Sequence, residues 1–112
     1  MITSLITIFL AGFIFSVLAI PLMKRKIKMN SWYGIRLPQT MANENVWYEV
    51  NEKVGRYIFF FGLLICALTV LVYLYPIIDK IFSVYILLAV LVLGSILLIV
   101  ISINYAKKFG NQ

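Results

Sequence analysis

The residues of this chain that are best suited to gripping a ligand lie together in one short polar and aromatic segment. This segment reads Asn30-Ser31-Trp32-Tyr33-Gly34-Ile35-Arg36-Leu37-Pro38-Gln39-Thr40. Gly34 permits a positive φ and Pro38 holds Leu37 extended, so a turn is expected around Arg36. A guanidinium beside aromatic rings can bind a polar head group or a peptide. The alternative is a structural elbow at the membrane surface, in which Arg36 pairs with a phosphate or with Glu44.

Residue types that support catalysis or metal binding are scarce. The 112 residues include no histidine and a single cysteine, Cys66, which lies in an apolar run. One thiol without a histidine gives neither a zinc-ligand set nor a nucleophile–base pair. We therefore expect no enzyme activity, no metal site and no cofactor.

The elements that must position this segment are membrane spans. Hydrophobic residues make up 63% of the chain and charged residues 12%, whereas soluble domains have roughly 45–50% and about 25%. Three runs contain no Asp, Glu, Lys, Arg or His: Ile2 to Met23, Tyr57 to Tyr75 and Phe82 to Ile103. At about 1.5 Å per helical residue, each approaches or exceeds a hydrocarbon core of about 30 Å. The first run lacks the basic n-region of a signal peptide, so we expect it to be retained as a span.

We therefore predict an all-α integral membrane protein with three transmembrane helices and an interfacial helix in the first loop. The predicted segments are transmembrane helices at 1–23, 57–75 and 82–103, a basic motif loop with an amphipathic helix at 24–56, a short external turn at 76–81, and a cytoplasmic tail at 104–112. The turn is short enough for the second and third spans to form an antiparallel hairpin.

The distribution of basic residues predicts the orientation. The segment from Lys24 to Arg56 holds seven Lys and Arg residues, whereas the turn holds only Lys80. By the positive-inside rule the loop and the tail are cytoplasmic and the N-terminus is outside. We expect a multi-pass membrane protein. The net charge of +6 then indicates topology and contact with lipid head groups by Lys24, Arg25, Lys26 and Lys28, and not binding of nucleic acid.

A helix is expected to begin after the polar segment. Thr40 is a candidate N-cap, and a helix from about Met41 would align Trp47, Asn51 and Gly55 at i, i+4 and i+8. Gly55, and Gly62 further along, would allow another helix to approach closely. Trp47, Asn51 and Gly55 are therefore predicted to form a packing seam.

These positions resemble a known family. Asn30, the run Tyr33-Gly34-Ile35-Arg36-x-Pro38-x-Thr40, and then Trp47, Asn51 and Gly55 are similar to the signature of the SdpI/YfhL family of bacterial membrane proteins. The resemblance implies that these ten residues are the motif or binding candidates, and that the protein lies in the bacterial plasma membrane. The family's best-known member is an immunity protein that protects a toxin-producing cell from its own secreted, membrane-acting peptide and also holds a repressor at the membrane. That protein is longer, with a further membrane-spanning half that this sequence lacks, and this chain has Leu37 where the family often has threonine.

Three functions follow as hypotheses. The first is an immunity or signalling protein that binds a toxic peptide, or the lipid surface it attacks, without chemistry. The second is a small transporter or channel, which would require a homo-oligomer; the uncharged spans count against it. The third is a structural subunit that binds another membrane protein. The sequence leaves the ligand and the oligomeric state open, as well as whether the loop enters the bilayer or lies on it.

Overall fold

The computed structural model describes residues 2–109, and all of the regular secondary structure in this range is helical. The helices are α1 (Ile2–Met23), α2 (Pro38–Ala42), α3 (Glu44–Leu74) and α4 (Lys80–Lys107). Within the described residues, α1, α3 and α4 are long and apolar enough to cross a membrane. The fold class predicted from the sequence, an all-α protein with three spanning helices, is thereby confirmed.

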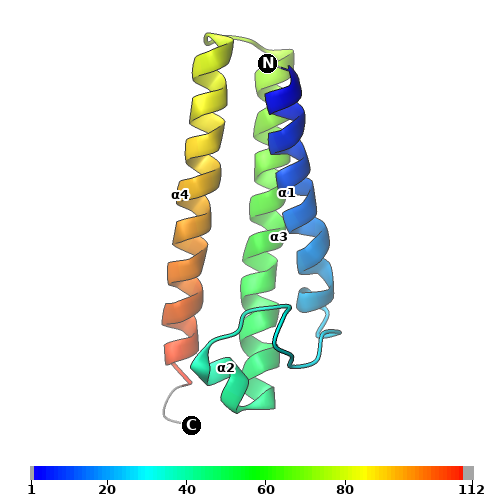
Figure 1. Cartoon of the computed structure of the whole chain (residues 1–112), viewed down its shortest axis with the longest axis vertical. Coiled ribbons are helices and arrows are strands. Elements are labelled where there is room, and N and C mark those ends of the chain that lie inside the picture. Colours follow the sequence, from blue (N-terminus) through cyan, green and yellow to red (C-terminus); the bar gives the residue numbers. More distant parts are fainter. Residues whose placement is uncertain (1, 110–112) are drawn as a thin grey trace.

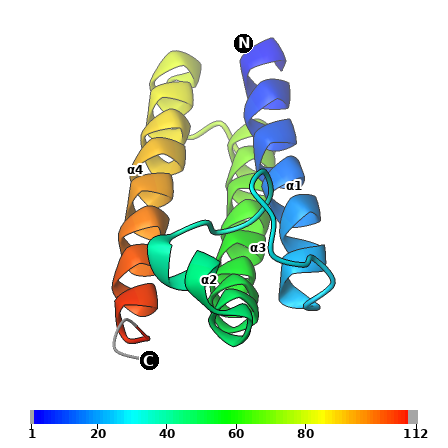
Figure 2. The same cartoon turned by 60° about the horizontal axis from the view of Figure 1, so that its bottom comes forward.

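The three long helices lie side by side along the long axis of the molecule, with α3 adjacent to both α1 and α4 (Figure 1). The α3–α4 connection lies at one end, called here the turn end. The segment between α1 and α3, residues 24–43, lies at the opposite end together with the last turns of α4. We call this segment the motif loop and this end the loop end. Figure 2 shows the motif loop and α2 passing across α3 between α1 and α4.

Small residues bring α1 and α3 into close contact. Gly12 and Ser16 of α1 face Gly62 of α3 so closely that a Cβ on Gly62 would overlap both. The Ser16 hydroxyl also donates a hydrogen bond of 2.8 Å to the Phe59 carbonyl oxygen. Lipid tails are as apolar as the helix surfaces, so the hydrophobic effect does not drive helices together in a membrane. Their association depends instead on close packing of this kind and on hydrogen bonds between helices. The expected close approach of another helix at Gly62 is therefore present, and the partner is α1.

The amphipathic helix of the first loop is not a separate element. It forms the first turns of α3, whose 31 residues extend roughly 46 Å, more than a hydrocarbon core requires. Only α2, five residues long, is a separate helix in the motif loop. The helix continues past Gly55 into the membrane span because a single glycine costs only about 1 kcal/mol in a helix.

The expectation that Thr40 caps this helix was wrong. Asn43 is the N-cap of α3, with an extended backbone and a side chain that accepts hydrogen bonds from the amides of Asn45 and Val46. Thr40 lies within α2, where its hydroxyl accepts a bond of 2.8 Å from the Leu37 amide. Pro38 begins α2 three residues earlier than a helix from Met41 would begin, because proline fits the first helical position and leaves Leu37 extended.

We predict that Gly62→Leu destabilises the bundle by about 1–3 kcal/mol, because the added side chain cannot fit against α1. The apparent Tm in mild detergent measures the effect. Ala67→Leu is the matched control, since Ala67 is an exposed residue of α3. Equal tolerance of the two substitutions would contradict the close α1–α3 contact.

Candidate functional site

Two buried side chains of α3 hold the backbone of the motif loop. The Asn51 side chain is 2% exposed and its Oδ1 accepts a hydrogen bond of 2.6 Å from the Ile35 amide. Its Nδ2 donates a bond of 2.8 Å to the Trp47 carbonyl oxygen, which fixes the orientation of the amide. The fully buried Trp47 donates from Nε1 to the Ile27 carbonyl oxygen at 2.8 Å. Asn51 and Trp47, four residues apart on α3, therefore provide hydrogen-bond partners for the Ile35 amide and the Ile27 carbonyl of the motif loop.

Gly34 lies directly against these two side chains. Its φ is +109°, a conformation that side chains with a Cβ rarely adopt. A Cβ at Gly34 would also lie 2.8 Å from Asn51 Oδ1 and 2.9 Å from Trp47 Cη2. The turn and the close contact both require glycine at this position.

The turn before Gly34 is organised by Asn30 and Tyr33. Asn30 Oδ1 accepts hydrogen bonds from the amides of Trp32 and Tyr33, at 2.9 and 2.6 Å. The Tyr33 hydroxyl donates to the Leu18 carbonyl oxygen in α1. Burial raises the pKa of Tyr33, so the phenol stays protonated and able to donate. The turn presents Trp32 outward, with 77% of this residue exposed.

The second half of the polar segment is folded by Thr40. Its hydroxyl, fully buried, lies 2.8 Å from the Ile35 carbonyl oxygen, to which it donates. The carbonyl and the amide of Ile35 are therefore both bonded to side chains, those of Thr40 and Asn51. Arg36 is exposed and donates to the Ser31 carbonyl oxygen. Within residues 2–109 it forms no ion pair, so Glu44 is not its partner in the described structure.

Gly55 completes the seam by packing against the end of α1. A Cβ at this position would lie 3.2 Å from the Leu22 Cβ and 3.3 Å from the Met23 backbone nitrogen. Trp47 and Asn51 face the motif loop and Gly55 faces α1. The three seam residues thus join α3 to the two segments that precede it.

An ion-pair cluster at the end of α1 was not anticipated from the sequence. Arg25, with a left-handed φ of 58°, places its guanidinium 2.8 Å from Glu49 and 3.0 Å from Glu52. The hydrogen bond from Arg25 holds the pKa of Glu52 below its usual range. The spacing of Glu49 and Glu52 places both carboxylates on one face of a helix, which indicates a shared cationic partner. The sequence offers four candidates, Lys24, Arg25, Lys26 and Lys28, and does not distinguish among them. Lys24, Lys26 and Lys28 are exposed.

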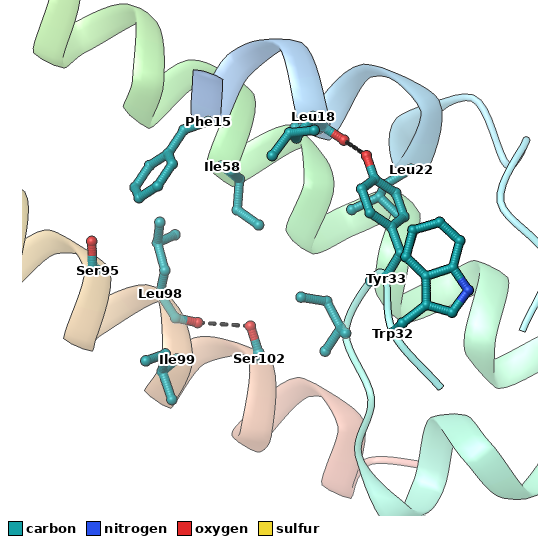
Figure 3. A pocket seen from close by; sticks show the side chains of 13 residues that line it. Phe15, Leu18, Leu22, Trp32, Tyr33, Ile58, Ser95, Leu98, Ile99 and Ser102 are labelled. Atoms are coloured by element: carbon teal, nitrogen blue, oxygen red, sulfur yellow. Dashed lines mark hydrogen bonds between the residues drawn. The ribbon is translucent and has the colours of Figure 1, made fainter. Parts of the chain in front are cut away.

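A lateral cleft of about 360 Å³ lies between α1 and α4, with α3 behind it and the motif loop at its end. Figure 3 shows Phe15, Ile58 and Leu98 projecting into it from three different helices, with Tyr33 and Trp32 on the loop side. Ser95 and Ser102 also line it, but their hydroxyls donate to the Leu91 and Leu98 carbonyl oxygens, each at 2.7 Å. The cleft is suited to an apolar group. The cleft could not be predicted from the periodicity of any single helix, because its walls form only when three helices and the motif loop assemble.

Comparison with known proteins identifies one family. The model of the SdpI/YfhL protein family matches residues 26–105. The match covers most of the motif loop, all of α3 and nearly all of α4. The chain matches no curated protein and no solved structure.

We predict that Asn51→Ala loosens the motif loop at a cost of about 1–3 kcal/mol, because the Ile35 amide loses its partner. Limited trypsin digestion in detergent should cleave after Arg36 faster than in the unaltered protein. Asn45→Ala, an exposed asparagine on the same helix, is the control. Unchanged digestion of the Asn51 variant would show that the amide does not hold the loop.

The Arg25–Glu52 ion pair predicts a pH dependence. A carboxyl with a lowered pKa contributes stability that is fully present above its ordinary value of 4.5 and is lost as the pH falls through the lowered value. The apparent Tm of the unaltered protein should exceed that of Glu52→Gln at neutral pH, and this gap should close in acid. A gap that persists once the carboxyl is protonated would contradict the ion pair.

Proposed function

This chain belongs to the SdpI/YfhL protein family, and from that premise we propose that it is a membrane immunity protein. It protects a bacterial cell from a membrane-acting toxic peptide by binding the peptide, without catalysis. Membership of the family supports a multi-pass membrane protein of this type, and toxin immunity is the role of the family's best-known member.

The lateral cleft is the observation that carries the proposal. Its volume of about 360 Å³ falls in the range of ligand sites, roughly 300–1,000 Å³. Its lining is mainly apolar and includes no carboxylate or ammonium group. The hydroxyls of Ser95, Ser102 and Tyr33 are bonded to backbone carbonyl oxygens. A peptide that inserts into lipid presents apolar side chains, and these match such a lining. The proposed binding depends on shape and burial, which is why no catalytic group is required.

The level of the cleft defines how a peptide would reach it. Its walls are formed by the second half of α1 and the second half of α4, next to the motif loop. With the basic motif loop in the cytoplasm, as the positive-inside rule favours, the cleft lies in the inner half of the bilayer. A peptide would enter it sideways from the lipid after inserting. Capture at that depth withdraws the peptide from the assemblies that depolarise the membrane.

The test is protection of a sensitive bacterium that produces this protein. Cells are challenged with the secreted toxic peptide of the family's immunity system, and membrane potential is followed with a potential-sensitive dye. We expect the unaltered protein to preserve both potential and survival. Unchanged killing, with the protein verified in the membrane, would remove the immunity function.

A matched pair of variants tests the cleft itself. Ile99→Trp adds bulk at a residue that lines the cleft, whereas Ile96→Trp adds the same bulk at an exposed residue of the same helix that does not line it. We expect the first variant to lose most of the protection and the second to retain it. Protection that survives Ile99→Trp in a folded protein would place peptide binding elsewhere.

A further inference from the structure

A second cluster of cations lies at the loop end, on the surface where α3 meets α4. The Lys53 ammonium lies 4.7 Å from the centre of the Tyr105 ring, and the Lys108 ammonium lies 5.7 Å from the same centre. Phe109 packs edge-on against this ring, with centroids 5.4 Å apart. Two side chains of like charge, one from α3 and one from the C-cap of α4, thus contact one tyrosine ring.

Neither ammonium has an acidic partner in the part of the chain that the structure describes. Glu49 lies four residues before Lys53 and would be its natural partner along the helix. However, Arg25 engages both Glu49 and Glu52, and Arg56 engages Glu52 as well. The carboxylates nearest in sequence are therefore committed to other cations. Two ammonium groups beside one ring, with no carboxylate paired to either within residues 2–109, favour the binding of an anion.

Both lysines lie at the depth of phospholipid head groups. Lys53 precedes the uncharged run that begins at Tyr57 by four residues, and Lys108 follows the run that ends at Ile103 by five. At about 1.5 Å per residue, each lies roughly 6–8 Å beyond the apolar segment of its helix. Tyr105 follows Ile103 by two residues, roughly 3 Å beyond the apolar segment of α4, where aromatic residues typically mark the interface. Its hydroxyl makes no hydrogen bond within residues 2–109, and so it too can donate to a phosphate.

We infer that Lys53, Tyr105 and Lys108 form a binding site for the phosphate of one anionic phospholipid. The two ammonium groups bind the phosphate, and their cation–π contacts with the Tyr105 ring keep both beside it. The site is distinct from the lateral cleft, whose lining includes none of these three residues. It is also separate from Lys24, Lys26 and Lys28, which are exposed in the motif loop beyond the end of α1.

Native mass spectrometry of the full chain in mild detergent, titrated with phosphatidylglycerol, tests this site. We expect a defined one-lipid complex whose affinity falls at least about fivefold in the double variant Lys53→Gln/Lys108→Gln, the loss expected for even one such charge. The control, Lys26→Gln/Lys28→Gln, removes the same charge from the motif loop, whose lysines are expected to contact head groups individually, and its loss of affinity should be clearly smaller. Lys53→Arg/Lys108→Arg keeps the charge and should keep the binding.

Three results would overturn the assignment. Equal losses in the two Gln variants would mean that phosphatidylglycerol responds only to net charge. Equal binding of phosphatidylcholine would mean that the lipid's negative charge is not recognised. Displacement of the lipid by an equal concentration of inorganic phosphate would mean that the site takes free phosphate. A circular dichroism spectrum unchanged in Lys53→Gln/Lys108→Gln excludes unfolding as the cause of a loss.

Discussion

The structure of the loop end depends on one buried amide, that of Asn51. A connector that packs against membrane helices must have its backbone hydrogen bonds satisfied from within the protein, because lipid offers no partners. Asn51 accepts from the Ile35 amide and donates to the Trp47 carbonyl oxygen, so it ties the loop to α3 with its own orientation fixed. The neighbouring contacts of Trp47 with Ile27 and of Thr40 with Ile35 extend the same attachment in both directions.

This arrangement gives the motif residues a definite physical role. Asn30, Tyr33, Gly34, Thr40, Trp47, Asn51 and Gly55 all make contacts within the chain that shape the motif loop or join it to α1 and α3. Of these seven residues, only Tyr33 and Gly34 line the lateral cleft. The proposed peptide contact therefore falls mainly to apolar residues outside the motif, such as Phe15, Ile58 and Leu98. The motif residues hold the motif loop in its conformation, and the membrane-spanning helices provide most of the residues that line the cleft.

Much of the fold could be predicted from the sequence because lipid imposes a strict rule on length and polarity. The uncharged runs beginning at Ile2, Tyr57 and Phe82 each lie within one long helix, except that Tyr75 at the end of the second run is the C-cap of α3. The close approach of another helix at Gly62 could be predicted because glycine has no side chain to prevent it. The start of α3 was placed wrongly because Thr40 and Asn43 are residue types that both favour the N-cap, and in the structure the Thr40 hydroxyl is bonded to Ile35 and Leu37 within the motif loop. The Arg25 cluster and the cleft were missed for a similar reason: each joins segments far apart in the chain, and a single sequence carries no record of such pairing.

The central claim is that Asn51 holds the motif loop in a folded, protected conformation at the end of the bundle. Amide hydrogen exchange at Ile35, measured in lipid nanodiscs, tests this most directly. The structure predicts slow exchange at this amide, comparable to that of amides inside α3, although Ile35 lies outside any helix. Exchange at the rate of an unstructured peptide would show that Asn51 does not hold the motif loop. The loop would then not form the end of the lateral cleft as described.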